Sequence, residues 1–152
     1  MTASLTVPAG VTLTIEPGTT VYAAAGVTIQ ATGTGRILAE GTPASRIRFS
    51  AVPGGANWGA LDIINASNES RFSCCDFENL AGTTVGGHNA KCHVENGVAY
   101  FDNTRWGNTP AVQYISFVNS SFIVSNSIFP TYPGTFNTTS APEMLHGSNG
   151  IP

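Results

Sequence analysis

The chain has 152 residues, within the range of a single domain, and carries 6 Lys and Arg against 9 Asp and Glu, a net charge of −3. Charged residues make up only 10% of it, against about 25% in an ordinary soluble domain, and this excludes a charged helical bundle. Binding to nucleic acid or to an acidic membrane surface is not expected either, because both depend on clustered Lys and Arg.

Small hydrogen-bonding residues take the place of the missing charges, with 18 Thr, 13 Ser and 12 Asn beside 17 Gly and 9 Pro. Thr, Val, Ile and Phe favour strands, and Gly and Pro favour the tight turns between them. No apolar run approaches the length of about eighteen residues that a membrane span needs, and residues 1–8 lack the features of a signal peptide. The composition therefore predicts an all-β protein.

The first third of the chain, residues 5–49, alternates apolar residues with Thr or other polar residues. Turn residues separate the alternating stretches, with ProAlaGly at 8–10 and ProGly at 17–18. This pattern predicts short strands joined by turns.

The middle of the chain repeats at intervals of 23 to 29 residues. Phe49, Phe72, Phe101 and Val124 follow one another at offsets of 23, 29 and 23. The same register aligns Cys74 with Asn103 and Asn126; Phe77 with Trp106 and Phe129; Ile63 with Cys92 and Ile115; Asn65 with Val94 and Phe117; and Ser67 with Asn96 and Asn119. Repeats of this length indicate stacked coils, none of which can bury its apolar face alone.

These runs carry a resemblance to a known family. Residues 5–19, the run ArgIleLeuAlaGluGlyThrPro at 36–43 and the IleArgPhe strand at 47–49 resemble the opening coils of bacterial right-handed parallel β-helix proteins of the pectate-lyase-like superfamily. The resemblance covers residues 3–130 and implies a single right-handed parallel β-helix of about five to six coils over residues 1–130. Residues 131–152 are expected to form an irregular C-terminal arm.

A short parallel β-helix is expected to expose strand edges and core side chains at both ends. The chain is therefore interpreted as a piece of a longer protein, extracellular or on the cell surface, and as one that associates with itself through uncapped ends. Asn103 and Asn126 are predicted to pass amide hydrogen bonds between coils at a bend. Cys74, Cys75 and Cys92 are predicted to be free thiols, with Cys74 and Cys92 buried.

Strand alternation predicts which residues face outward. If Ile63, Cys92 and Ile115 point inward, their neighbours form outward rows, namely Asp62, Lys91 and Tyr114, then Ile64, His93 and Ser116, then Ala66, Glu95 and Val118. Cys75 and Asp102 are also expected to face outward, on another sheet. One face thus gathers two carboxylates, the only lysine, a histidine, a tyrosine and a serine.

Three interpretations of this face remain open. It could perform acid–base chemistry through Lys91 or His93, assisted by Tyr114, Asp62 or Glu95. It could hold a divalent metal such as zinc through His88, His93 and His146, although the spacing matches no strong zinc signature. It could also be an ordinary solvated sheet face on which Asp62 pairs with Lys91.

Two further residues are candidates for chemistry. Trp58 follows ProGlyGly at a turn and, together with Ser116, could contact a substrate such as a sugar, although packing in the core is also open for Trp58. Cys75 could be a nucleophile near a histidine.

Two functions follow from these candidates. The leading one is a carbohydrate-associated or structural role as part of an extracellular bacterial β-helix protein. The alternative is a small hydrolase that acts on an ester or a phosphoester through His93, with or without a metal, either on one chain or at a subunit interface.

Overall fold

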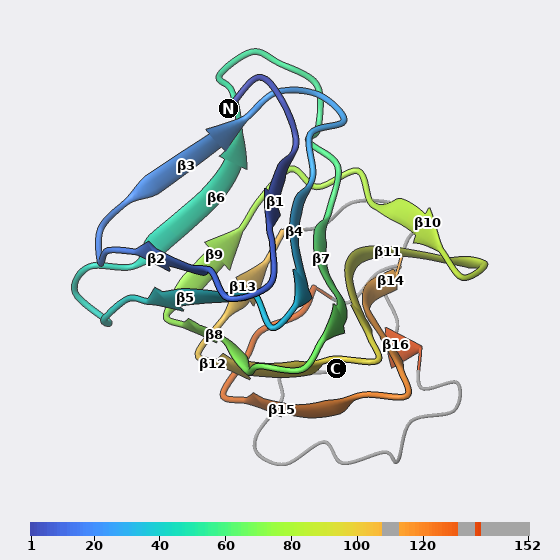
Figure 1. Ribbon diagram of the computed structural model, residues 1–152. Coiled ribbons are helices and arrows are strands. Elements are labelled where there is room, and N and C mark those ends of the chain that lie inside the picture. Colours follow the sequence, from blue (N-terminus) through green and yellow to red (C-terminus); the bar gives the residue numbers. More distant parts are fainter. Residues whose placement is uncertain (108–112, 131–135, 138–152) are drawn as a thin grey trace.

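A computed structural model describes residues 1–107, 113–130 and 136–137, and this part of the chain consists of strands and turns without a helix. The prediction of an all-β protein with parallel strands is confirmed (Figure 1). The predicted C-terminal arm, residues 131–152, lies outside the described residues except for one short strand at Phe136–Asn137.

The strands divide among three sheets. Sheet A contains β1 (Leu5–Val7), β4 (Ile29–Gly33), β7 (Leu61–Ala66), β10 (Thr83–Val85), β11 (His88–Glu95), β14 (Gln113–Val118) and β16 (Phe136–Asn137). Sheet B contains β2 (Thr12–Ile15), β5 (Arg36–Glu40), β8 (Ser70–Ser73), β12 (Val98–Asp102) and β15 (Ser121–Ser125). Sheet C contains β3 (Thr20–Ala23), β6 (Ile47–Ala51), β9 (Cys75–Phe77) and β13 (Arg105–Trp106).

The chain visits the three sheets in the same order again and again. Strands β1, β2 and β3 belong to sheets A, B and C, and so do β4–β6, β7–β9 and β11–β13, after which β14 and β15 return to A and B. We call each such passage a rung. Strands of successive rungs pair in parallel, and the one antiparallel pair among the described strands joins β10 to β11.

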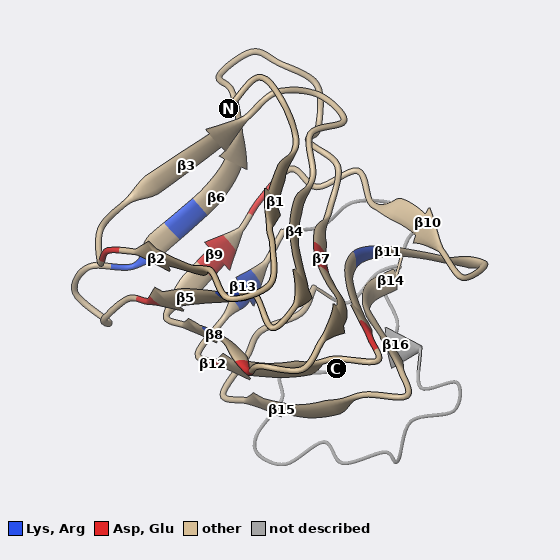
Figure 2. Cartoon of the chain, in the orientation of Figure 1, with Lys and Arg blue, Asp and Glu red and all other residues tan. Residues whose placement is uncertain are grey.

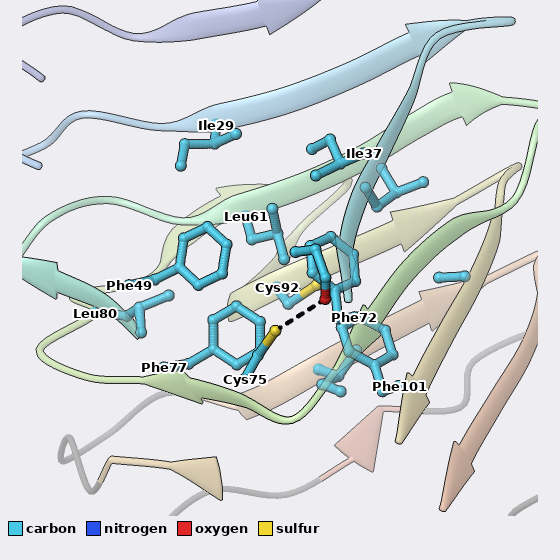
Figure 3. Packing of buried hydrophobic residues seen from close by; sticks show 14 of the residues in the cluster. Ile29, Ile37, Phe49, Leu61, Phe72, Cys75, Phe77, Leu80, Cys92 and Phe101 are labelled. Atoms are coloured by element: carbon cyan, nitrogen blue, oxygen red, sulfur yellow. Dashed lines mark hydrogen bonds between the residues drawn. The ribbon is translucent and has the colours of Figure 1, made fainter. Parts of the chain in front are cut away.

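The core lies between the three sheets and is built from columns of inward side chains. In sheet B, Phe72 pairs with Phe101 and Phe101 with Val124, as the repeat predicts. In sheet C, Phe77 pairs with Trp106, and their rings stack with centroids 4.4 Å apart. Figure 3 shows Phe72, Phe77 and Phe101 near Ile29 and Leu61 of sheet A. Stacking across rungs is therefore the main contact of the core.

The predicted alignments of Phe49 and of the residues of β7 with those of β11 are wrong: Val94 pairs with Ile63 and not with Asn65, and Asn96 lies over Asn65 and not over Ser67. Phe49 lies on sheet C, where it pairs with Phe77, so it does not stand over Phe72. Cys92 pairs with Leu61, two residues before the expected Ile63. Ile64 pairs with Glu95 and Ser70 with Ala99, so five residues separate the paired positions after β7 but only three after β11, and the two extra residues shift the register upstream of them. Because the shift is even, Ile63 and Cys92 both still face inward and are fully buried.

The rungs bend at residues with left-handed backbone. One column of bends contains Cys74, Asn103 and Asn126, at φ of 50°, 51° and 49°, and a second contains Asn65, Asn96 and Asn119, at 51°, 47° and 48°. Asn tolerates this conformation better than other residues that carry a side chain. The side-chain bonds at the first column differ from the predicted link between Asn103 and Asn126, because Asn103 Nδ2 donates to Cys74 Sγ at 3.3 Å and Asn126 Nδ2 donates to Asp102 Oδ1 at 2.9 Å. An amide-to-amide bond between rungs occurs at the second column, where Asn96 Nδ2 donates to Asn65 Oδ1 at 3.1 Å.

Arg46 joins three rungs at the corner between sheets B and C. Its guanidinium donates to Asp76 Oδ1 at 2.8 Å and to the Cys75 carbonyl at 3.0 Å, both in the next rung. It also donates to the Asn103 carbonyl at 2.8 Å, one rung further on. Its side chain is only 13% exposed, so these charge-assisted bonds are largely shielded from water.

We expect Cys74→Asn to stabilise the protein by about 0.5–1 kcal/mol, because Asn accepts the left-handed conformation more readily than Cys. Its side-chain oxygen can also replace the sulfur as acceptor for Asn103. Thermal unfolding followed by circular dichroism measures the change. The reverse variant, Asn126→Cys, is the control and should lower the midpoint; a lower midpoint for Cys74→Asn would contradict the explanation.

Candidate functional site

The candidate site is a row of polar residues on the outward face of sheet A. Asp62 on β7 pairs with His93 on β11, and His93 pairs with Ser116 on β14. Adjacent strands lie about 4.8 Å apart, so the three side chains are direct neighbours. The expected rows, in which Asp62 stood beside Lys91 and Ile64 beside His93, are wrong because of the two-residue shift in register.

All three side chains of the row are buried, although strand alternation predicted an exposed face. Asp62 is 6% exposed, His93 2% and Ser116 1%. Above His93 lies a hairpin made of β10 and the start of β11, in which Thr83 pairs with Ala90. The hairpin projects from the side of sheet A (Figure 1). The hairpin contacts His93 through the Thr83 carbonyl.

The hairpin turns at Gly86 and Gly87, whose φ angles of 55° and 84° favour glycine. A Cβ on Gly86 would lie 3.5 Å from the Glu95 carboxylate, so the turn folds back over the end of β11. Glu95 is half-buried as a result. Sequence reasoning missed this hairpin, although the two glycines between strand-forming residues are its signal.

The hairpin also fixes the protonation of His93. The imidazole Nε2 lies 2.9 Å from the Thr83 carbonyl oxygen, which can only accept a hydrogen bond, so Nε2 carries the proton. Burial lowers the pKa of His93, while the hydrogen bond to Thr83 and the charge of Glu95 oppose this effect. Since the net effect lowers the pKa, His93 is neutral at pH 7.

Around His93 lie the described buried side-chain oxygens that have no hydrogen-bond partner. They are Asp62 Oδ1, Thr83 Oγ1, Gln113 Oε1 and Ser116 Oγ. Asp62 and Ser116 flank His93 on the neighbouring strands, and Thr83 and Gln113 both pair with Ala90 of the same strand β11. Burial raises the pKa of Asp62 to about 7. A weak acid, a neutral base and a hydroxyl thus stand in one row, the residue types of proton transfer and nucleophilic attack.

Lys91 and Tyr114 do not belong to this row. The Lys91 side chain is fully buried, its Nζ donates to the Gly107 carbonyl, and it lies 4.3 Å from the centroid of the Tyr114 ring. Burial lowers the pKa of Lys91 to about 8. Tyr114 packs in the core against Phe129, with ring centroids 5.3 Å apart, and donates to the Pro130 carbonyl at 3.0 Å. The expectation that both residues face solvent is wrong.

Trp58 and Cys75 are also buried. Trp58 stacks near Phe49, and its Nε1 donates to the Glu78 carbonyl at 2.8 Å, so it packs in the core and presents no surface to a sugar. Cys75 was expected to face outward, but the left-handed bend at Cys74 resets the alternation, and its Sγ donates to the Ala39 carbonyl at 3.2 Å (Figure 3). Burial raises the pKa of the Cys75 thiol, which makes it a poor nucleophile. All three cysteines are free and buried.

The predicted metal ligands are not brought together in the part of the chain that the structure describes. His88 is half-buried at the start of β11, and Nε2 of His93 is occupied by the Thr83 carbonyl. His146 lies outside the described residues. Among the described residues no group of three or more His, Cys, Asp or Glu side chains could hold a metal ion.

Comparison of the chain with protein-family models, with curated proteins and with solved structures gave no match in any of the three. In the described ranges no helix is long and apolar enough to cross a membrane.

We expect Lys91→Met to stabilise the protein at pH 7 by about 1–2 kcal/mol, because it replaces a buried ammonium that faces only a carbonyl and a ring. The folded state has the lower pKa, so the wild type gains stability as pH rises from about 8 towards 10.5, and the variant does not. The difference should therefore shrink over this range. Urea unfolding at pH 7, 9 and 10 measures it, and a variant less stable than the wild type at pH 7 would refute the explanation.

Proposed function

We propose that the chain is a right-handed parallel β-helix of the pectate-lyase-like type, with a structural role. The repeated order of sheets A, B and C supports this proposal, because it is the order in which a solenoid would lay its strands. Right-handedness is favoured because parallel strands of one sheet are joined by right-handed crossings in about 98% of cases. An extracellular or cell-surface location in a bacterium belongs to the same proposal.

The observation that carries the structural role is the continuous stack of aromatic rings through the rungs. Phe49 stacks on Phe77 at 5.0 Å, Phe77 on Trp106 at 4.4 Å and Trp106 on Phe129 at 5.9 Å. Beside this stack, Phe72 lies on Phe101 at 5.1 Å. Rings that stack on rings of neighbouring rungs make the core rigid along the stack. A rigid core of this kind suits a protein that spaces or supports other parts of an assembly.

The structural role is favoured over sugar binding by the states of two aromatic side chains, Trp58 and Tyr100, while Tyr22 on β3 is exposed. Trp58 is buried, and the half-buried Tyr100 on sheet B has the Arg71 guanidinium 4.5 Å from its ring centroid. A sugar ring stacks on an open aromatic face, and the Arg71 guanidinium already occupies one face of Tyr100. Neither residue is suited to be a sugar-stacking platform.

We expect neutral and acidic polysaccharides to leave the thermal midpoint of the protein unchanged. A ligand present at a hundred times its Kd would stabilise the folded state by about 2.7 kcal/mol, which calorimetry resolves easily. Lysozyme with soluble chitin fragments serves as the positive control. A reproducible rise in midpoint with any one polysaccharide would reverse the preference and support the carbohydrate-associated role.

A hydrolase is the second candidate, and the in-register row of Asp62, His93 and Ser116 favours it. In this candidate the neutral His93 is the base, and the substrate is a small ester or phosphoester. The sequence-based version with a bound divalent metal has less support, because Nε2 of His93 donates to Thr83.

If the chain is such a hydrolase, we expect His93→Ala to lower the rate of p-nitrophenyl ester or phosphate hydrolysis by at least about 100-fold, the usual contribution of a positioned base. Ser121→Ala, on the exposed side of β15, is the matched control and should keep the wild-type rate. Excess chelator should leave the rate unchanged and would abolish it in the metal version. No turnover by the wild type, or equal turnover by His93→Ala, would eliminate this candidate.

A further inference from the structure

The bend between β11 and β12 contains an Asn–Gly pair, Asn96 and Gly97. Asn96 is exposed and lies in the second column of bends, between Asn65 of the preceding rung and Asn119 of the following one. The three Asn residues have nearly the same φ, from 47° to 51°. They differ in the residue that follows, which is Gly after Asn96 but Ala after Asn65 and Ser after Asn119.

The packing of the rungs requires both residues of this pair. Asn96 adopts the left-handed conformation, which Asn accepts better than most residues. At Gly97 a Cβ would lie 3.0 Å from the Ile63 carbonyl oxygen and 3.2 Å from Ile63 Cγ2, so a larger residue fits only if the preceding rung moves. The fold therefore keeps an Asn–Gly pair at this bend.

An Asn–Gly pair is chemically labile, because the backbone nitrogen of the Gly can attack the Asn side chain. The attack joins that nitrogen to Cγ, the bond from Cγ to Nδ2 breaks, and Nδ2 leaves as ammonia with the proton of the attacking nitrogen. Water then opens the resulting succinimide ring at either carbonyl, which gives Asp or isoaspartate. A Cβ on the following residue hinders ring closure, and glycine has none.

We infer that Asn96 is a site of spontaneous deamidation and that Asn65 restrains it. The exposed side chain of Asn96 is open to water, which the second step consumes. Its Nδ2 donates to Asn65 Oδ1 at 3.1 Å, and the side chain has to give up this bond before Cγ can turn onto the Gly97 nitrogen. The inference does not depend on the proposed function.

The attacking nitrogen is held less firmly than the side chain. The Gly97 N–H donates to Ser120 Oγ at 3.4 Å, which is longer than an ordinary N–H···O bond. The bond between Asn96 and Asn65 is therefore the stronger of the two restraints on ring closure.

Deamidation changes the bend in two ways. Asp at position 96 lacks the donor that bonds Asn65, and its carboxylate follows directly after Glu95. Strands β14 and β15 of the next rung carry no charged residue that could offset the added charge (Figure 2). Isoaspartate also inserts a CH2 group into the backbone, so β11 and β12 can no longer both stay in register with their neighbours.

Incubation of the full chain at mildly alkaline pH, followed by peptide mass spectrometry, tests the site. We expect conversion at Asn96 to be at least about tenfold faster than at Asn65 or Asn119, because only Asn96 precedes a glycine. Labelling by isoaspartyl methyltransferase identifies the isoaspartate product. An Asn96 that converts no faster than the other two, or that stays intact throughout, overturns the inference.

Two variants test the restraint, and both keep the left-handed bend because Gly adopts it freely. Asn65→Gly removes the acceptor of the Asn96 amide, and the loss of this hydrogen bond should raise the rate at Asn96 at least about twofold. Asn119→Gly, in the same column of bends, removes no bond described for the Asn96 side chain and is the matched control. Equal rates at Asn96 in the two variants overturn the role of Asn65.

A third variant, Asn96→Gly, keeps the bend but has no amide to lose. After the same incubation the thermal midpoint, followed by circular dichroism, should fall in the wild type and not in Asn96→Gly. The other Asn–Gly pair, Asn149 and Gly150, lies outside the described residues and is present in both proteins, so the comparison isolates Asn96. A wild type that keeps its midpoint while Asn96 is converted overturns the expected effect on the bend.

Discussion

Parallel pairing between rungs is the interaction on which the rest of this structure depends. Each rung contributes only a few inward side chains to each sheet, and these become buried only when another rung covers them. Leu61, Cys92 and Ile115 illustrate this dependence, since they come from three rungs and form one fully buried column. The bends between sheets support this pairing, because left-handed Asn residues turn the chain at equivalent positions of successive rungs. Arg46 adds to it by joining three rungs at one corner.

The region around β11 differs from the remaining structure in the polar side chains that it buries. Away from this region the buried polar side chains of the described residues are hydrogen-bonded Ser and Thr, namely Ser50, Ser70, Thr104, Ser120 and Ser127. By contrast, β11 buries Lys91 and His93 next to Asp62. Buried polar groups lower stability unless they find partners, and several oxygens around His93 have none. Local conflicts of this kind occur in folded proteins mainly where function requires them. The conflict is the physical reason to keep the hydrolase candidate beside the structural role.

The sequence by itself determined the all-β class, the parallel stacking of Phe72, Phe101 and Val124, and the inward face of most strands. These features depend on composition and on a periodicity of two residues, both of which are local. Even the wrong alignment of Ile63 with Cys92 preserved the inward and outward faces, because the extra residues between the paired positions after β7 are even in number.

Tertiary structure alone decided which residues become neighbours across strands and which outward residues stay in water. Loop length sets the register between rungs, so only the folded chain places Asp62 beside His93. Burial of Lys91, His93 and Ser116 depends on segments that come from elsewhere in the chain, and alternation along a strand contains no information about them. Cys75 shows the same limit, because a single left-handed residue before it reverses the face that alternation assigns.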